Sequence, residues 1–561
     1  MTTSFLLPPA LVLIAAGLVL PLTRGALRSL VLLVAPLVTL YFVWQVPDGM
    51  AATTRFLGQQ LVVVEGSKLA RLFASVFAVM AFGGALFALN QPRTMELAAA
   101  FVYAGGAVGA AFAGDLITLF AFWELMAIAS TLVLWSAGEP ARAAGLRYAA
   151  IHFLGGVLLM AGIAGEVAAT GSALFKPLDT STLPRLLILA GFLINAAAFP
   201  MAAWLPDAYP KASWSGMVFL SAFTTKTAVL VLMRGFPGTE MLIWIGLAMV
   251  VYGIVYAVIE DDMRRIIAYA LVNQGGIMLV GIGIGSELSL NGTAAHAVVC
   301  ILYIALLAMA AGSVIVATGR HRCSELGGLA GQMPVTALAA VVGAASIASV
   351  PLTVGFVSKS MVIDAAAKEQ LAAGWFVLTG GAAAAVLHAG LRLPWLVFFG
   401  EGRDIAAKDP AWNMRAAMVL FALLCIGFGA MPGPLYDLLP FTVDYVPYTM
   451  AHVVVQLQLL LAGAVAFFAL RAWLPAGRRI TLDVDWLWRG AGPVLARGVN
   501  RMFDGAAHAV IALTVALRRM SFDKLYRHHG PEGVFGRSWP TGRMTFWTTV
   551  MLGAYLILGY L

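Results

Sequence analysis

Charged side chains are scarce in this 561-residue chain: Asp, Glu, Lys and Arg make up 11% of it, whereas 61% of the residues are hydrophobic. Too few polar residues remain to cover a soluble core, so the composition excludes a soluble domain. A helix needs about 20 mostly apolar residues to cross a bilayer, and such runs recur along nearly the whole chain. Runs such as Val76 to Leu89 are apolar on every side, which excludes a membrane β-barrel. The sequence therefore predicts an all-α, polytopic integral membrane protein.

Cysteines and enzyme motifs are also few. The three cysteines, Cys300, Cys323 and Cys425, have neither metal nor redox spacing. No glycine-rich nucleotide loop, iron–sulfur cluster motif or nucleophile constellation is present. We therefore expect a membrane transporter subunit rather than an enzyme, with no catalytic residue, no cofactor and no metal. The formal charge of +8 lies in loops rather than in basic clusters interleaved with aromatics, so no nucleic-acid partner is expected.

Apolar runs predict about 14 core spans and about 2 C-terminal spans. They lie near 5–22, 25–45, 68–90, 95–113, 115–136, 148–169, 184–207, 214–233, 240–259, 266–286, 294–317, 335–365, 373–399, 414–431, 448–474 and 544–561. Basic residues gather in alternate loops, which favours an N-terminus on the outer side. The same orientation places the basic amphipathic segment 475–543 in the cytoplasm, along the membrane surface and beside anionic lipid.

Two of these spans are interrupted by helix-breaking residues. Pro200 and Pro206 fall in a break near 195–210, and Pro351 and Gly355 in a break near 351–359. Broken helices at matching positions predict two inverted five-helix repeats. The predicted divisions are 1–112 (N-terminal spans), 113–234 and 235–400 (the repeats), 401–474 (further spans), 475–543 (the basic segment) and 544–561 (the terminal span).

Four charges fall inside apolar runs: Glu124, Lys226, Lys359 and Arg392. Each costs about 2.5–3.5 kcal/mol to insert, and intramembrane charges usually mark ion or proton pathways. Two of them also have structural interpretations. Lys359 follows a helix break and would satisfy freed carbonyls, and Arg392 lies near a span end, where a long stem reaches the interface.

Histidines and loop charges are weaker signals. His296 and His388 lie within spans, either as satisfied core groups or as proton relays. The run "EDDMRR" at 260–265 is interpreted as a solvated loop face with local ion pairs.

Several motifs together carry a family resemblance: "FAFWELMAIAS", "AAAFPMAAWLPDAYPKAS", "FTTKTAVLVLMRGF", "DDMRRIIAYALVNQGG", "SELGGLAGQMP" and "VPLTVGFVSKS". They resemble the antiporter-like proton-channel subunits of the respiratory NADH dehydrogenase membrane arm. The resemblance is closer to the D-type subunits of the Mrp-type multisubunit monovalent cation/proton antiporters of bacteria. It extends from residue 70 to residue 490.

The resemblance implies a hydrated axis of charges along the bilayer midplane. Glu124, Lys226 and Lys359 match its fifth-, eighth- and twelfth-span members, whereas Asn195 stands where the family has a seventh-span lysine. The family's histidine and lysine in the eleventh span are replaced here by Cys300 and Ile304. One turn before Cys300, His296 lies on the same helical face as a candidate substitute.

Two hypotheses about function stay open at this point. In the first, the chain moves protons, in exchange for Na⁺ or K⁺, within a hetero-oligomeric antiporter in the bacterial cell (inner) membrane. Its partners would be the other subunits, including D-like paralogues. In the second, Asn195, Cys300 and Ile304 block the path and the chain has a scaffold and coupling role. Another possible assembly is a respiratory or hydrogenase-type redox complex.

Overall fold

The computed structural model describes residues 7–56, 58–471 and 483–560 and contains two compact units, Met1–Val484 and Asp485–Leu561. The first unit contains α1 (Pro9–Val19), α2 (Gly25–Gln45), β1 (Gly49–Phe56), β2 (Gln59–Gly66), α3 (Lys68–Phe87), α4 (Thr94–Phe112), α5 (Leu116–Trp135), α6 (Glu139–Thr170), α7 (Leu183–Asn195), α8 (Trp204–Ala208), α9 (Gly216–Leu220), α10 (Thr224–Gly235), α11 (Met241–Ile259), α12 (Met263–Ile284), α13 (Glu287–Thr318), α14 (Pro334–Ile347), α15 (Val354–Lys368), α16 (Ala372–Ala385), α17 (Trp412–Ala430), α18 (Gly433–Tyr436) and α19 (Met450–Leu470). The second contains α20 (Asp485–His529) and α21 (Thr541–Tyr560).

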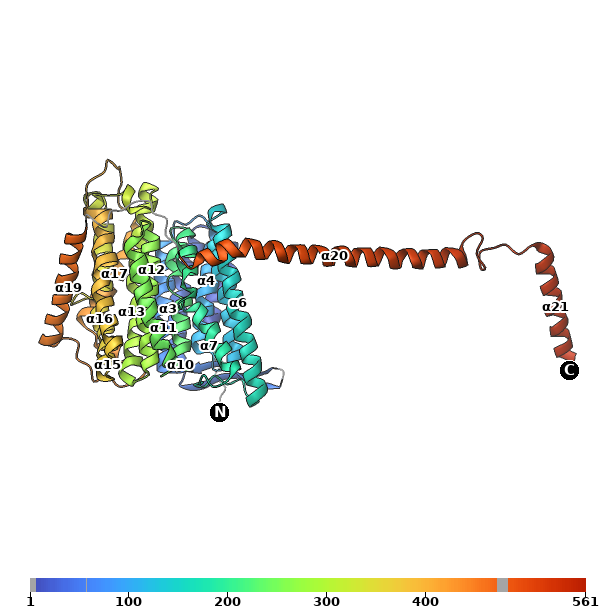
Figure 1. Cartoon of the computed structure of the whole chain (residues 1–561), viewed down its shortest axis with the longest axis horizontal. Coiled ribbons are helices and arrows are strands. Elements are labelled where there is room, and N and C mark those ends of the chain that lie inside the picture. The colour runs from blue at the N-terminus through green and yellow to red at the C-terminus, as the bar shows by residue number, and fades with distance from the viewer. Residues whose placement is uncertain (1–6, 57, 472–482, 561) are drawn as a thin grey trace. The chain divides into compact units, whose positions relative to one another are not determined.

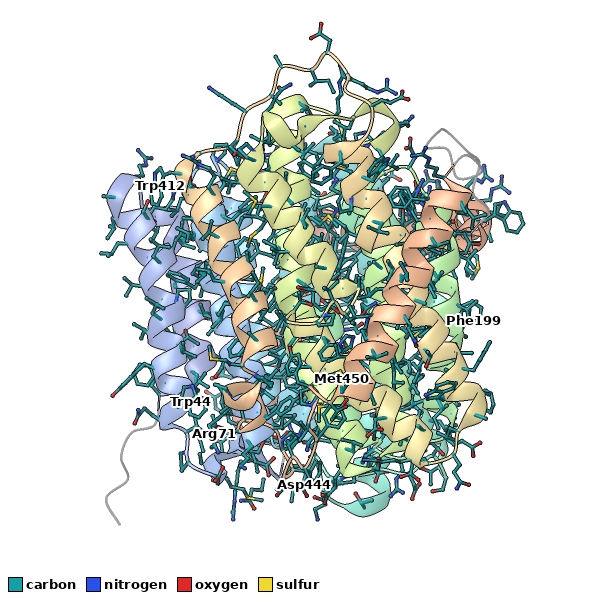
Figure 2. The ribbon with its side chains drawn as sticks, turned by 90° about the vertical axis from the view of Figure 1, so that its left-hand side faces the viewer. Trp44, Arg71, Phe199, Trp412, Asp444 and Met450 are labelled. Carbon is teal, nitrogen blue, oxygen red and sulfur yellow. The ribbon has the colours of Figure 1, made fainter. Side chains whose placement is uncertain are left out.

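The helices of the first unit stand side by side with their long axes roughly aligned (Figure 1). Within the described residues, 12 helices are long and apolar enough to cross a membrane, and three shorter apolar helices accompany them. The predicted all-α polytopic membrane fold is therefore confirmed. Trp412, at the start of α17, lies at the opposite end of the bundle from Met450, at the start of α19 (Figure 2). Successive long helices thus alternate in direction here, as a polytopic chain requires.

A β-hairpin between α2 and α3 was not predicted. Strands β1 and β2 pair antiparallel, with Thr53 opposite Val62. Val62 is buried, its N–H donates to the Asp115 carboxylate at 2.8 Å, and its carbonyl accepts from Gly114 N–H at 2.9 Å. The hairpin is therefore fastened to the turn before α5. The β-branched run "LVVV" is typical of a strand, but it is too short to stand out beside the apolar runs that indicate membrane spans.

Both predicted helix breaks are present and share one backbone motif. After α7 ends at Asn195, Ala197 is left-handed (φ 54°) and Ala198 N–H donates to Leu193 O at 3.0 Å. After α14 ends, Ser349 is left-handed (φ 59°) and Val350 N–H donates across five residues in the same way, at 2.9 Å. This is the Schellman helix ending. The local likeness supports the predicted repeat, whose inverted relation stays a prediction.

The breaking residues act differently from one another. Pro200 and Pro351 lie in the unwound turns. Pro206 is the third residue of α8 instead, in a first turn where a missing N–H does no harm, so it does not itself interrupt the helix. Gly355 permits close packing at the second break, because a Cβ there would lie 1.8 Å from Ser346 O.

We expected the charge run at 260–265 to be a solvated loop face with local ion pairs. The local pair is present, with Arg265 Nε 2.8 Å from the Glu260 carboxylate, but the run is partly buried rather than solvated. Asp261 is only 7% exposed, and Ser324 Oγ donates to its carboxylate at 2.6 Å. Asp262 caps α12 and pairs with His321 Nδ1 at 2.7 Å. Burial alone would raise the pKa of Asp262, but His321 and Arg264 outweigh it and hold that pKa below its usual value. The run therefore ties the α11–α12 turn to the loop after α13.

The C-terminal predictions are met in part. Some predicted residues lie outside the described residues: 5–6 of the first span, 472–474 of the span at 448–474, 475–482 of the basic segment, and 561 of the last span. The described remainder of the basic segment is mostly the helix α20, whose described side chains are largely exposed. The predicted terminal span corresponds to the helix α21, and its membrane crossing stays a prediction. Asp483, the first residue described after 471, accepts hydrogen bonds from Tyr252 and Tyr269 at 2.7 and 2.6 Å.

Gly355→Ala is expected to destabilise the second break, because the atom that the new methyl meets is a backbone carbonyl and cannot rotate away. Overpacking of this kind costs about 1–3 kcal/mol of unfolding free energy. Thermal denaturation in detergent should therefore show a lower midpoint. Gly427→Ala is the matched control, since nothing lies within 4 Å of a Cβ at that helical position. An unchanged midpoint for Gly355→Ala would contradict the close packing.

Candidate functional site

Glu124 projects from α5 against α6. A Cβ on Gly156 of α6 would lie 2.0 Å from Glu124 Oε1, so glycine at that position leaves room for the carboxylate. Asn195, at the end of α7, packs near the preceding residue, Gly155, and is 4% exposed. Neither Glu124 Oε1 nor Asn195 Oδ1 has a hydrogen-bond partner among the described residues. The two polar side chains thus approach neighbouring residues of α6, and each has one buried oxygen without a hydrogen-bond partner in the described chain.

Lys226 is 1% exposed and lies near the start of α10. Its Nζ donates to Ser221 O at 3.4 Å, a carbonyl in the turn between α9 and α10. The sequence predicted one continuous span at 214–233, so this interruption was missed. Beside Lys226 is a cavity of about 10 Å³, which is lined partly by Ala196 and Ala197 of the first break. That is space for about one water molecule, so Lys226 and the first break share a water-sized gap.

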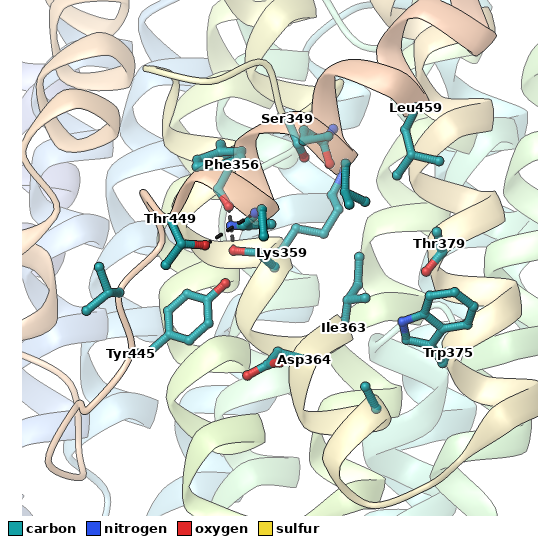
Figure 3. A pocket seen from close by; sticks show the side chains of 17 residues that line it. Ser349, Phe356, Lys359, Ile363, Asp364, Trp375, Thr379, Tyr445, Thr449 and Leu459 are labelled. Atoms are coloured by element: carbon teal, nitrogen blue, oxygen red, sulfur yellow. Dashed lines mark hydrogen bonds between the residues drawn. The ribbon is translucent and has the colours of Figure 1, made fainter.

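Lys359 is also 1% exposed, and its Nζ donates to Ile347 O at 2.8 Å, the carbonyl of the last residue of α14. The structural interpretation, in which this lysine satisfies a carbonyl freed by the break, therefore describes part of its role. Lys359 also lines a cavity of about 440 Å³ (Figure 3). Trp375, Val446 and Val455 line the same cavity and are exposed, so it opens to the surface of the chain.

Between the two lysines, α13 contributes a fully buried polar network. His296 Nδ1 lies 3.1 Å from Ser358 Oγ, and its Nε2 lies 3.1 Å from Gln274 Oε1. Tyr303 OH donates to the same Gln274 oxygen at 3.1 Å. Because that oxygen can only accept, the neutral His296 carries its proton on Nε2 and its Nδ1 accepts from Ser358. Cys300, one turn along α13 from His296, is fully buried.

His388 and Arg392 lie apart from this network, in the π-helical turn η6 (Val386–Arg392) that follows α16. Arg392 Nη1 donates to Glu260 O at 2.8 Å, which places its head at the end of α11. His388 is fully buried, and within the described chain neither of its ring nitrogens has a hydrogen-bond partner. Short π-helical segments often occur at functional positions. His388 nevertheless shares no hydrogen bond with the other predicted residues.

No metal site is evident in this part of the molecule. Within the described ranges, no group of three or more His, Cys, Asp or Glu side chains could hold a metal ion. The arrangement offers proton carriers instead: a half-buried carboxyl group, and two ammonium groups and an imidazole that are buried among the helices.

Comparison with known proteins identifies this region. The family model described as NADH:quinone oxidoreductase/Mrp antiporter, transmembrane, matches residues 113–386. Residues 113–386, just under half of the chain, thus match the transmembrane domain described by this antiporter family model. The matched residues include Glu124, Asn195, Lys226, His296 and Lys359, and the Mrp-type resemblance drawn from the motifs is confirmed.

Individual relatives agree with this match to an antiporter family model. The chain is 32% identical to the A/B-type subunit of a probable K⁺/H⁺ antiporter of Rhizobium meliloti, over 61% of its own length and 36% of the relative's. It is 28% identical to the D-type subunit of the Na⁺/H⁺ antiporter of Alkalihalophilus pseudofirmus, over 58% of its own length and 68% of the relative's. In the Mrp complex from Dietzia sp., a chain of 20% identity superposes with a TM-score of 0.70, covering 83% of this chain and 99% of that one. This last likeness concerns the fold alone.

Sequence analysis missed several buried polar residues of the antiporter-family domain and its neighbourhood. Gln274 was seen only as part of the "NQGG" motif. Glu96 is fully buried at the start of α4, and Ser213 and Ser215 each donate to its Oε1 at 2.6 Å. The position of Glu96 beside a predicted span end suggested an exposed acid, and no local signal indicated that the loop at 213–215 covers it.

Replacement of Ile363 by cysteine tests the cavity beside Lys359. Ile363 lines the cavity, whereas its neighbour Val362 is fully buried in the helical core. Ile363→Cys should react quickly with a small cationic thiol reagent and Val362→Cys slowly, as measured by mass spectrometry of the folded protein. The native cysteines provide a low background because all three are buried. A reaction of Ile363→Cys as slow as that of Val362→Cys would show that the cavity does not admit solutes.

Proposed function

We propose that the chain is an ion-translocating subunit of a multisubunit monovalent cation (Na⁺ or K⁺)/proton antiporter. Protons would move along a row of buried titratable groups from Glu124 through Lys226 to Lys359. One observation carries the proposal: both lysines are about 1% exposed, and each donates to a backbone carbonyl at a helix interruption. The buried His296, hydrogen-bonded to Ser358 and Gln274, adds a titratable ring to the same core.

The chemistry follows from the surroundings of each lysine. A buried ammonium group is held by one carbonyl instead of by water, so its charge is sensitive to any charge that arrives nearby. A proton placed on one member of the row therefore favours release from the next. His296 can take a proton at Nδ1 from the Ser358 side, while the Gln274 oxygen accepts from Nε2 and orients the ring. Release from Nε2 requires a bound water as acceptor, because the Gln274 carboxamide does not titrate. Such coupled steps would carry charge sideways through the bundle.

The blocked-path hypothesis rests on Asn195, Cys300 and Ile304. Ile304 is fully buried and cannot carry a proton, and Asn195 does not titrate. His296 favours conduction, because it bridges from Ser358, the neighbour of Lys359, to Gln274 without using residue 304. The same proposal includes a role in the proton pathway for each of the predicted site residues, which are Glu124, Asn195, Lys226, His296, Lys359, His388 and Arg392.

A single chain is not expected to suffice for exchange. Glu124 is only half-buried on α5, and the nearby Ile128 and Leu132 of the same helix are 48% and 44% exposed. One end of the row therefore reaches the lateral surface, where a neighbouring subunit would continue it. We infer a hetero-oligomeric complex in the bacterial inner membrane, with the other antiporter subunits as partners. Redox subunits in the purified assembly would indicate the respiratory alternative instead.

Glu124→Gln in the assembled complex tests transport directly. The amide keeps the size of the side chain but cannot release a proton, so Na⁺- or K⁺-driven proton movement should fall about tenfold or more. The measurement is dissipation of a preformed pH gradient in everted membrane vesicles, with assembly checked on native gels. Glu287→Gln, at an exposed acid on α13, is the matched control. Unchanged exchange in Glu124→Gln would favour the scaffold hypothesis.

A further inference from the structure

A second buried polar cluster lies between α5 and α10, outside the predicted row. Its members come from four elements of the first unit: Tyr103 of α4, Tyr148 and His152 of α6, Tyr209 of the short turn η3 (Tyr209–Lys211), and Thr224 of α10. All five side chains are 2% exposed or less. We call them the hydroxyl cluster. None was singled out in the sequence, because each is an ordinary residue for a span.

The centre of the hydroxyl cluster is a contact of 2.5 Å between Tyr103 OH and Thr224 Oγ1. Tyr103 OH also accepts the Thr224 N–H at 2.8 Å. The Tyr209 ring lies 6.4 Å from the Tyr148 ring, centroid to centroid, and its hydroxyl has no hydrogen-bond partner among the described residues. Tyr148 OH donates in turn to Ser130 Oγ of α5 at 2.9 Å. One buried hydroxyl pair therefore joins α4 to α10, and a second joins α6 to α5.

His152 extends the cluster toward Glu124. Its Nδ1 lies 2.9 Å from the Tyr148 carbonyl, which can only accept, so Nδ1 carries the proton and Nε2 is a free acceptor. That Nε2 is buried and has no partner among the described residues. Four residues further along α6, on the same helical face, Gly156 packs against the Glu124 carboxylate. The basic nitrogen of His152 therefore belongs to the α6 face that meets Glu124.

The other side of the cluster reaches the start of α10, the helix that carries Lys226. Thr224 precedes Lys226 by two residues, so the two side chains leave the helix in different directions and a bridging water is needed between them. Asn195 is the alternative connection between Glu124 and Lys226, but its carboxamide does not titrate. The carbonyl of the neighbouring Ile194 is already occupied, because it accepts from Trp204 Nε1 at 2.9 Å. Hydroxyl groups differ from the carboxamide, because each can accept one proton while it releases another. The cluster is thus better suited to proton transfer than Asn195.

We propose that the hydroxyl cluster is a proton relay between Lys226 and Glu124 that bypasses Asn195. This inference rests on the proposed function. One proton leaves the Lys226 ammonium group, and each hydroxyl takes a proton on its oxygen and passes its own onward. His152 Nε2 binds the proton and returns it to the Glu124 carboxylate, with water bridging the gaps. Buried Tyr209 OH and His152 Nε2 have no partners in the described chain, and such atoms usually bind water. No other covalent bond changes.

The test removes hydroxyls while keeping side-chain volume. Tyr103→Phe and Thr224→Val should each slow cation-driven proton movement about tenfold or more in vesicles holding the assembled complex. Thr224→Ser, which restores a hydroxyl, should recover the rate and the wild-type ratio of rates in H₂O and D₂O. Tyr436→Phe and Thr131→Val are matched controls, since those hydroxyls bond only to backbone carbonyls, Val357 O and Ala127 O. Both controls should retain the wild-type rate.

The outcomes separate the relay from the proposed function. If Glu124→Gln abolishes exchange while Thr224→Val and Tyr103→Phe keep the wild-type rate, the relay is wrong and the proposed function stands. If Glu124→Gln is also without effect, the proposed function itself fails. If Tyr103→Phe does not assemble, the comparison of Thr224→Val with Thr224→Ser decides. A rate that stays low in an assembled Thr224→Ser variant would overturn the relay, because packing rather than the hydroxyl would then matter.

Discussion

The pairing of two buried ammonium groups with carbonyls at helix interruptions is the interaction on which the rest of the structure depends. An ammonium group in a low-dielectric interior loses its hydration and needs an acceptor. An unbroken helix offers none, because every carbonyl except those of the last turn is used within the helix. The break after α14 frees Ile347 O for Lys359, and the turn between α9 and α10 frees Ser221 O for Lys226. Each helix interruption therefore provides the carbonyl that a buried lysine needs, and each lysine satisfies a carbonyl that the interruption leaves without a backbone partner.

The backbone at these interruptions is held in place by unusual residues. Ala197 and Ser349 adopt left-handed conformations without being glycine, which costs on the order of 1 kcal/mol each and persists only where packing enforces it. Gly355 lets α15 approach Ser346 closely, which keeps the end of α14 within reach of Lys359. The strain is thus concentrated where the helix ends must point into the bundle rather than toward lipid.

Sequence alone was sufficient for the features that composition and local chemistry determine. The apolar runs gave the membrane class, and prolines gave the two main breaks, because both effects act within one segment. The charges at 124, 226 and 359 stood out because an ionised group in an apolar run is costly wherever its partner lies. The sequence did not predict the contacts between segments that are far apart in the chain. No periodic pattern in the sequence indicates these contacts. They are the burial of Asp261 by the loop at 320–325, the covering of Glu96 by Ser213 and Ser215, and the contact of Tyr103 with Thr224.

The two halves of the predicted row differ in how well their polar atoms are satisfied. Around α13, both nitrogens of His296 and the ammonium group of Lys359 have partners within the protein. Around α6, Glu124 Oε1, Asn195 Oδ1 and His152 Nε2 have none in the described chain. Buried polar atoms without partners are costly unless water or an ion reaches them. The half near Glu124, which lies toward the lateral surface, therefore needs bound water or a neighbouring subunit to be stable, whereas the half near His296 is organised by the chain itself.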